Sequence, residues 1–273
     1  ADSVQYFQFR KSRGSTEKFH GAVVDHVGHN NTRVFRDVTE VGTELEALVD
    51  VVGCPVPSEV AVLYDWDIRW ILDEAAGPVK PLYEETVLTH YQSFWKQGIP
   101  VDVRESTDDL SGYKLIVAPM LYLIKPGVAE SLTEFVRQGG TLVGTFLTGI
   151  ADENDLVFEG GWPGPLRDVF GIWAEEIDYL YDDEANRIVP GDYAVKKVCD
   201  LIHTEGAEVI ATYGDDFYAG RPALTRNDFG TGHAWYLAAN GEQRFHDDFY
   251  SERIQELGLR PAMDLRLPEG VTA

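Results

Sequence analysis

The chain has 273 residues, of which 44% are hydrophobic, 12% aromatic and 25% charged. Its 6 Trp, 13 Tyr and 13 Phe supply ample apolar surface to bury, which excludes a wholly disordered chain. Acidic residues outnumber basic ones by 46 to 23, and the resulting net charge of −23 repels phosphate backbones and anionic lipid headgroups. We therefore expect neither nucleic acid nor a membrane as a partner, and no apolar run approaches the roughly 18 residues of a membrane span.

The lack of a visible signal peptide and the small number of cysteines favour a reducing compartment. The N-terminus has neither the basic segment nor the apolar segment of a signal peptide. The alternative that the chain was processed from a longer precursor stays open. Two cysteines, Cys54 and Cys199, cannot make a disulfide framework or, by themselves, a four-ligand zinc site. We expect a cytoplasmic protein.

The first 55 residues are predicted to form two strands and one helix. The strands cover residues 4–9 and 19–24, on either side of a polar loop. The helix begins after the N-cap Thr32 and ends near Val52, and its apolar residues lie on one stripe: Val34, Val38, Val41, Leu45, Leu48 and Val52. So few elements cannot bury a sheet and a helix stripe unaided. Either they pack on the rest of the chain or they belong to a larger domain, and we favour the larger domain.

From residue 59 the pattern changes to alternating strands and helices, typical of an open, doubly wound α/β sheet of flavodoxin-like order. The predicted strands are 60–64, 101–103, 115–119, 141–144, 208–213 and 233–237. The predicted helices are 81–97, with Leu82, Leu88, Tyr91 and Trp95 facing the core, 126–138, and 246–257. Residues 265–273 are typical of a linker.

The turn at residues 144–149 follows a predicted strand, where such sheets usually place their chemistry. In glutamine amidotransferase-type sheets this turn carries a strained cysteine nucleophile. Here the available positions hold Thr145, Phe146, Leu147 and Thr148. Cys54 lies in a linker and Cys199 in a helix-like stretch over 195–202, so the sequence predicts the scaffold without the amidotransferase chemistry.

Phosphate and metal sites are also disfavoured. The glycines form no Gly-x-Gly-x-x-Gly run after a strand. His26 and His29 lie three residues apart, but beyond Asp25 no acidic pair completes a metal shell. The acidic runs 152–155 and 182–184 lack the ligand spacing of a calcium loop. We expect no metal site and solvated acidic loops.

Glu17 and His20 are the candidate binding residues. They lie three residues apart beside Phe19, at the junction of a loop and a predicted strand. A carboxylate accepts two hydroxyl protons, and a neutral imidazole donates to one oxygen or accepts from another. Together they could bind adjacent hydroxyls of a sugar, although this spacing alone is a weak signal.

Two groups of motifs resemble glycoside hydrolase family 42, the bacterial β-galactosidases. Residues 6–14, 17–22 and 25–26 are similar to the last βα units of that family's catalytic barrel. Residues 148–155 and 163–172 resemble its middle domain, which has an amidotransferase-like α/β fold without amidotransferase chemistry and mediates trimerisation. Phe9 departs from the pattern, since many members have Trp there.

The resemblance implies a remnant of a (β/α)8 barrel over 1–55 and an amidotransferase-like trimerisation domain with a C-terminal linker over 56–273. It implies retaining hydrolysis of terminal β-D-galactosides, which uses two carboxyls about 5–5.5 Å apart. Both catalytic Glu residues would lie upstream of Ala1, so none is assigned in this chain. Glu17 and His20 match the family's galactose-contacting pair, and no organic cofactor is implied.

The expected protein is thus an inactive fragment of a homotrimeric β-galactosidase. The alternative is a non-enzymatic oligomerisation module of amidotransferase-like fold, in which the first 50 residues only contribute packing. A glutaminase or protease on the same sheet is disfavoured because residues 145–148 hold no cysteine.

Overall fold

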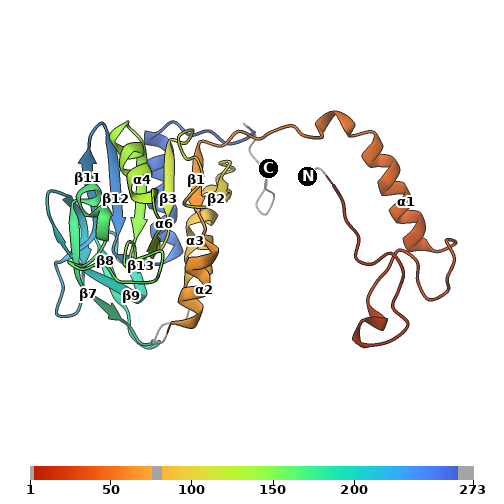
Figure 1. The fold of residues 1–273 in the computed structure, drawn as a ribbon, viewed down its shortest axis with the longest axis horizontal. Helices are drawn as coiled ribbons and strands as arrows, with labels where there is room; N and C mark the ends of the chain where they lie inside the picture. The colour runs from red at the N-terminus through yellow and green to blue at the C-terminus, as the bar shows by residue number, and fades with distance from the viewer. Residues whose placement is uncertain (1–2, 76–81, 264–273) are drawn as a thin grey trace. The chain divides into compact units, whose positions relative to one another are not determined.

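The computed structural model describes residues 3–75 and 82–263 (Figure 1). Contacts within the chain divide it into two compact units, Ala1–Val56 and Pro57–Ala273. The predicted linker over 265–273 lies outside the described residues. Among the described residues, no helix is both long enough and apolar enough to span a bilayer.

The first unit contains one α-helix, α1 (Arg33–Glu46), between two short 3₁₀ helices, η1 (Thr16–Phe19) and η2 (Val49–Val51). The predicted N-cap is confirmed, because the Thr32 hydroxyl accepts a hydrogen bond from the backbone N–H of Phe35 at 3.3 Å. The predicted end is wrong. The α-helix stops at Glu46, and the chain continues to Val51 in tighter turns.

The two strands predicted in the first unit do not form. Arg10 and Val24 make a single parallel bridge, supported by hydrogen bonds from Val23 N–H to the Gln8 carbonyl and from Val24 N–H to the Phe9 carbonyl. Phe19 is instead the last residue of the 3₁₀ helix η1, and residues 20–22 form neither helix nor strand. A strand forms only where a partner satisfies its backbone groups, and within this unit the pairing extends over about two residues.

Apolar side chains of the first unit remain uncovered. Val23 is its only fully buried hydrophobic residue among those described, and α1 buries none of its side chains. Val34, Leu45 and Leu48 lie exposed on the predicted stripe. This agrees with the expectation that these residues cannot form a core alone.

The second unit alternates strands and helices and then becomes mostly strands. Its helices are α2 (Trp66–Glu74), α3 (Tyr83–Trp95), α4 (Val128–Arg137), η3 (Gly164–Leu166), α5 (Arg167–Phe170) and α6 (Gln243–Glu256). Its strands are β1 (Val60–Leu63), β2 (Asp102–Arg104), β3 (Leu115–Ala118), β4 (Leu123–Ile124), β5 (Thr141–Thr145), β6 (Ala151–Asp152), β7 (Ile172–Tyr179), β8 (Asn186–Val189), β9 (Tyr193–Thr204), β10 (Glu208–Tyr213), β11 (Pro222–Phe229), β12 (Gly232–Leu237) and β13 (Ala239–Gly241).

One mixed sheet organises this unit. Its strands lie in the order β13-β9-β8-β10-β11-β12-β5-β3-β1-β2, and β7 also pairs with β9. Five neighbours are parallel, β12, β5, β3, β1 and β2, and the remaining pairs are antiparallel. Every residue of β1, β3 and β5 is buried, as expected for parallel strands covered on both sides.

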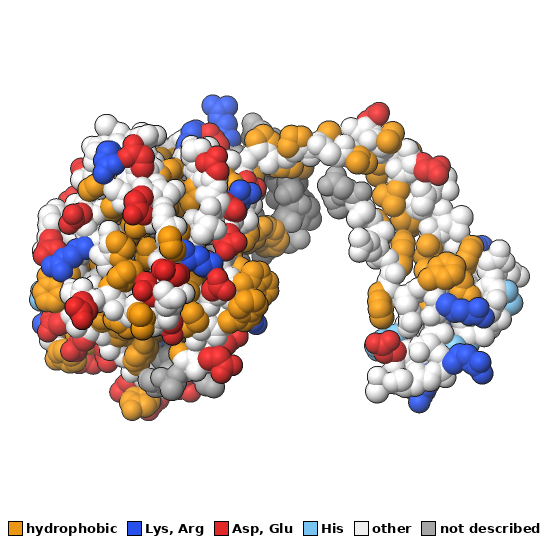
Figure 2. All heavy atoms as spheres, in the orientation of Figure 1, with side chains coloured by type: hydrophobic (Ala, Val, Ile, Leu, Met, Phe, Trp, Pro, Cys, Tyr) orange, Lys and Arg blue, Asp and Glu red, His pale blue; other side chains and the backbone are white. Residues whose placement is uncertain are grey.

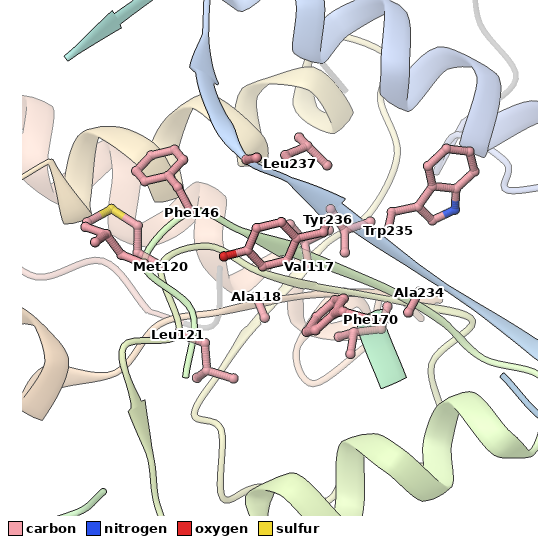
Figure 3. Close-up of a cluster of buried hydrophobic side chains, with 14 of the residues drawn as sticks. Val117, Ala118, Met120, Leu121, Phe146, Phe170, Ala234, Trp235, Tyr236 and Leu237 are labelled. Atoms are coloured by element: carbon pink, nitrogen blue, oxygen red, sulfur yellow. The ribbon is translucent and has the colours of Figure 1, made fainter. Parts of the chain in front are cut away.

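Helices cover both faces of the sheet, and two adjacent residues of β12 demonstrate it (Figure 3). The Trp235 ring packs against Phe249 of α6, whereas the Tyr236 ring packs against Phe170 of α5. Successive side chains of a strand point to opposite faces. Helices α5 and α6 therefore lie on opposite sides of the sheet, with α3 packed against α6.

Helix α3 confirms the predicted segment but not its predicted face. Leu82 is buried as expected, Tyr91 is half-buried, and Leu88 and Trp95 are exposed. The buried face instead contains Tyr83, Thr86, Val87, His90, Ser93 and Phe94. The prediction failed because half of this buried face is polar, so the periodicity of the apolar residues favoured the wrong side.

The antiparallel part also differs from prediction. Residues 195–202, expected to be helix-like, lie in strand β9, and Cys199 is buried there.

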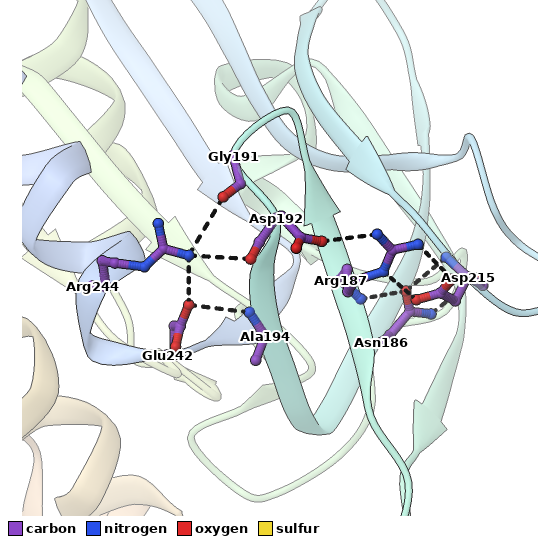
Figure 4. A network of polar contacts seen from close by, with 8 residues as sticks. All are labelled: Asn186, Arg187, Gly191, Asp192, Ala194, Asp215, Glu242 and Arg244. Atoms are coloured by element: carbon purple, nitrogen blue, oxygen red, sulfur yellow. Dashed lines mark hydrogen bonds and ion pairs between the residues drawn. The ribbon is translucent and has the colours of Figure 1, made fainter.

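A polar network links the antiparallel part of the sheet to the start of α6 (Figure 4). Arg187 donates two hydrogen bonds to Asp215 and one to Asp192. Arg244 in α6 donates to the Asp192 carbonyl at 3.1 Å.

A buried histidine pair joins α3 to α6. His90 and His246 lie with ring centroids 4.5 Å apart, and the Tyr250 hydroxyl is 2.5 Å from His90 Nδ1. His246 Nε2 donates to the Gly241 carbonyl at 3.2 Å, while His90 Nε2 and His246 Nδ1 have no partner. Burial lowers the pKa of both rings, that of His246 to about 4 in spite of nearby Asp247. The nearby His246 ring further lowers the pKa of His90.

This pair predicts acid destabilisation. Unfolded histidine binds a proton near pH 6.5, whereas folded His246 does so only near pH 4. The pair's contribution is therefore complete above pH 6.5 and is lost as the pH falls toward 4, by about 3 kcal/mol for His246 alone. Denaturant titrations between pH 7 and 4 should show a shallower decline in the free energy of unfolding for H90Q/H246Q than for the wild type. The exposed-residue control H29Q should follow the wild type, and parallel curves for all three proteins would contradict the assignment.

The turn after β5 depends on one glycine. Gly149 has φ +66°, and a Cβ added there would lie 2.3 Å from the carbonyl oxygen of Pro163. Both the left-handed backbone and the close approach of a second chain segment therefore require glycine. Gly160 has φ +96° but no atom within 4 Å of such a Cβ, so it shares only the first constraint.

We expect G149A to lower the free energy of unfolding by roughly 2–5 kcal/mol, the sum of left-handed strain and a backbone clash. The matched control G160A should cost only about 1–2 kcal/mol. Chemical denaturation of both variants measures the difference. Equal losses would mean that the Pro163 contact does not constrain the turn.

Candidate functional site

The 3₁₀ helix η1 positions the two candidate binding residues. The backbone N–H of His20 donates to the Glu17 carbonyl at 3.0 Å, so both side chains leave the same tight turn. Glu17 and His20 are exposed, and neither side chain bonds to another residue that the structure describes. Phe19 between them is 81% exposed, with the Lys18 ammonium 5.4 Å from its ring centroid. A carboxylate, an imidazole and an aromatic ring are thus free for a ligand.

A polar hollow of about 450 Å³ lies in the same unit, lined by Arg10, Lys11, Arg13, Asp25 and His26. Lys11 Nζ pairs with Asp25 at 3.1 Å, and His26 Nε2 donates to the Ser12 carbonyl at 2.8 Å. The His26 backbone N–H and the Lys11 ammonium lower the pKa of Asp25. The side chains of Asp25 and His26 are therefore both bound to neighbouring groups of the first unit.

The turn after β5 has no group able to act as a nucleophile. Thr145 Oγ1 accepts from Met120 N–H at 2.8 Å and donates to the Phe146 carbonyl, while Thr148 Oγ1 accepts from Thr145 N–H. Both hydroxyls are buried and bonded to backbone. Leu147 has φ +59°, a strained backbone in the region expected for an amidotransferase nucleophile, but it offers only a hydrocarbon side chain.

The buried acid Asp200, which the sequence analysis did not single out, hydrogen-bonds to this turn. Asp200 Oδ2 accepts from Leu147 N–H at 3.1 Å, from the Tyr236 hydroxyl at 2.7 Å and from Trp162 Nε1 at 3.4 Å. Burial raises the pKa of Asp200 to about 7, against these hydrogen bonds, which lower it. The sequence offers one signal for this site, which is the position of Asp200 among the apolar residues of β9. The assignment of residues 195–202 to a helix hid this signal.

The buried cysteine Cys199 and the acidic loop at Asp152 add no reactive centre. Burial raises the pKa of the Cys199 thiol to about 12, which disfavours the reactive thiolate. Asp152 Oδ1 accepts the backbone N–H groups of Asn154 and Leu156, so it closes its own loop. Among residues 3–75 and 82–263, no three His, Cys, Asp or Glu side chains are grouped as a metal site would require.

Two family models match the chain in sequence order. The model described as "Beta-galactosidase" matches residues 1–48, and the one described as "Beta-galactosidase trimerisation domain" matches residues 58–260. The first match contains Glu17 and His20, and the second contains the whole parallel sheet.

Curated relatives are similar over the full chain. A β-galactosidase from Clostridium perfringens is 54% identical and one from Alicyclobacillus acidocaldarius is 52% identical, each over 100% of this chain. This chain covers 41% of each of them, so it spans about two fifths of the length of these relatives.

Solved structures agree. The cold-adapted β-galactosidase from Rahnella sp. R3 superimposes with a TM-score of 0.92 and is 52% identical. The match covers 100% of this chain and 42% of the Rahnella chain. The β-galactosidase from the haloarchaeon Halorubrum lacusprofundi superimposes with a TM-score of 0.86 and is 28% identical. The match covers 100% of this chain and 40% of the Halorubrum chain. With the trimerisation-domain model matching residues 58–260, this chain belongs to the β-galactosidases of glycoside hydrolase family 42.

Proposed function

We propose that this chain is part of a β-galactosidase that hydrolyses terminal β-D-galactosides with retention of configuration. Within it, Glu17 and His20 bind the galactose and the second unit assembles the subunits. The observation that carries the proposal is the exposed Glu17–Phe19–His20 turn, free of other partners, inside the segment matched by the β-galactosidase model. The names of the relatives support the same substrate class.

The chemistry of the turn suits a sugar. The two oxygens of Glu17 can accept protons from adjacent hydroxyls, and the His20 ring can donate to or accept from another. The exposed Phe19 ring offers an apolar face to sugar C–H groups. No organic cofactor is needed for this hydrolysis.

The catalytic carboxyls are proposed to come from elsewhere in the protein. Retaining hydrolysis needs an acid/base and a nucleophile about 5–5.5 Å apart across the glycosidic bond. We assign both to the part of the relatives' length that this chain does not span. The chain by itself then binds galactose but does not cleave the bond.

Assembly is the proposed role of the second unit. Numbered along the chain, its five parallel strands lie in the order 2-1-3-4-5, which is the flavodoxin-like order of doubly wound sheets. With helices on both faces and a strained turn without a nucleophile after β5, this supports an amidotransferase-like scaffold without its chemistry. The family model that matches this unit describes a trimerisation domain, which supports a homotrimer.

The proposed domains are a barrel remnant over 1–55 and a trimerisation domain over 56–273. The division of contacts between Val56 and Pro57 supports this boundary. The two free cysteines favour a cytoplasmic location. The net charge of −23 disfavours nucleic acid and membranes as partners. The alternative, an assembly module with no part in sugar binding, is favoured only by the missing nucleophile.

The isolated 273-residue chain should not hydrolyse a chromogenic β-galactoside, because it contributes no catalytic pair. A longer chain that includes the remaining length of the family members should do so. Initial rates for both, at equal molar concentration, measure this. Turnover by the 273-residue chain, after removal of contaminating host β-galactosidase, would contradict the proposal.

In that longer protein, E17A and H20A should each lower kcat/KM roughly 5- to 150-fold, a loss of about 1–3 kcal/mol of transition-state stabilisation, since each leaves a sugar hydroxyl unpaired. The controls E40A and H29A remove the same groups from other exposed positions of the first unit and should leave the kinetics unchanged. Wild-type kinetics for E17A and H20A would remove the galactose-contact assignment and favour the assembly module.

A further inference from the structure

The 3₁₀ helix η1, from which Glu17 and His20 project, does not hold its own shape. It is four residues long and, in the part of the chain that the structure describes, it buries no side chain and has no side-chain hydrogen bond at its N-cap Ser15. Ser15 has φ +62°, a left-handed backbone that a residue with a Cβ adopts only at a cost. Short 3₁₀ turns and strained residues persist where the surrounding chain fixes them. The contacts that fix this turn must therefore lie on either side of it.

Backbone hydrogen bonds join the two segments that flank η1. Val24 N–H donates to the Phe9 carbonyl at 2.7 Å, and Lys11 N–H donates to the Val24 carbonyl at 3.0 Å. With the bridge between Arg10 and Val24, these bonds place residues 9–11 beside Val24. The chain between them, which includes η1, is a loop closed at its base.

Side chains extend this base beyond the backbone pairing. Lys11 Nζ pairs with Asp25 Oδ2 at 3.1 Å, and the Lys11 side chain is only 16% exposed. His26 Nε2 donates to the Ser12 carbonyl at 2.8 Å, where the chain leaves the base toward η1. Asp25 is itself fixed, because its carbonyl accepts the Gly28 N–H at 2.9 Å. We call Lys11, Ser12, Asp25 and His26 the loop clamp.

The charges around the loop clamp keep its ion pair formed. Arg10, Lys11 and Arg13 line the polar hollow together with Asp25, and neighbouring cations favour the ionised form of a carboxyl group. Figure 2 shows Lys, Arg and His side chains gathered over these loops, which Figure 1 places beside the start of α1. The Lys11 ammonium therefore has a charged acceptor at neutral pH.

We propose that His26 and the Lys11–Asp25 ion pair are positioning residues that hold Glu17 and His20 in place for galactose. This inference rests on the proposed function, because it takes Glu17 and His20 as the galactose contacts. The loop clamp acts on them through the backbone: it fixes the chain at Ser12, and the turn that follows keeps its direction. A sugar that binds a turn already in place does not have to order that turn.

Kinetics of the longer β-galactosidase measure the role of the loop clamp. H26A should lower kcat/KM roughly 10-fold, because small displacements of binding groups are costly even when the substituted residue does not contact the substrate. K11M removes the ion pair and should lower kcat/KM in the same direction. H26Q keeps an N–H donor at a similar reach from the backbone and should restore most of the activity. The control H29A removes an imidazole outside the clamp and should leave the kinetics unchanged.

A double-mutant cycle separates positioning from a purely structural role. The E17A/H20A background has no galactose contacts left to position, so H26A should change kcat/KM by less than about 2-fold there. A loss of folded protein would lower the activity by the same factor in both backgrounds. Positioning should also raise KM, whereas a smaller folded fraction lowers kcat alone. Thermal melting of each variant reports the folded fraction independently.

The outcomes distinguish this inference from the proposed function. Wild-type kinetics for H26A and K11M, equal losses from H26A in both backgrounds, or a loss that H26Q does not restore would overturn the positioning role. Each of these results would leave Glu17 and His20 as galactose contacts. Wild-type kinetics for E17A/H20A would instead overturn the contacts themselves, and the positioning role with them.

Discussion

The parallel strands at the centre of the second unit must be covered on both faces, and much of the remaining structure depends on this constraint. Strands β1, β3 and β5 present no exposed residue, so helices have to pack on each side of them. Packing α3 against α6 brings His90 and His246 together in a buried interface, which lowers the pKa of both rings and so favours their neutral forms. The same packing directs Leu88 and Trp95 outward. The buried histidine pair and the exposed positions of Leu88 and Trp95 thus have one cause.

The turn after β5 keeps a strained geometry although it carries no reactive group. Leu147 has a left-handed backbone, and such strain persists only where the surroundings determine it. Here the Asp200 carboxylate binds the Leu147 N–H, and Pro163 lies against Gly149. Because Asp200 also accepts from Tyr236, the turn is attached to both β9 and β12. In this chain the strained turn serves packing, which fits the proposed assembly role of the unit.

The elements predictable from sequence were those whose local pattern is unambiguous. The strand predicted over 60–64 forms over Val60–Leu63, and the helix predicted over 126–138 forms over Val128–Arg137, before Gly139-Gly140. Helix α2 was missed because its nine residues mix Trp, Asp and Arg without a clear period. The assignment of 195–202 to a helix failed because β9 forms through antiparallel pairing with β7 and β8, and only tertiary contacts define that pairing. Glu17 and His20 could be singled out through the family resemblance, since their spacing alone is common.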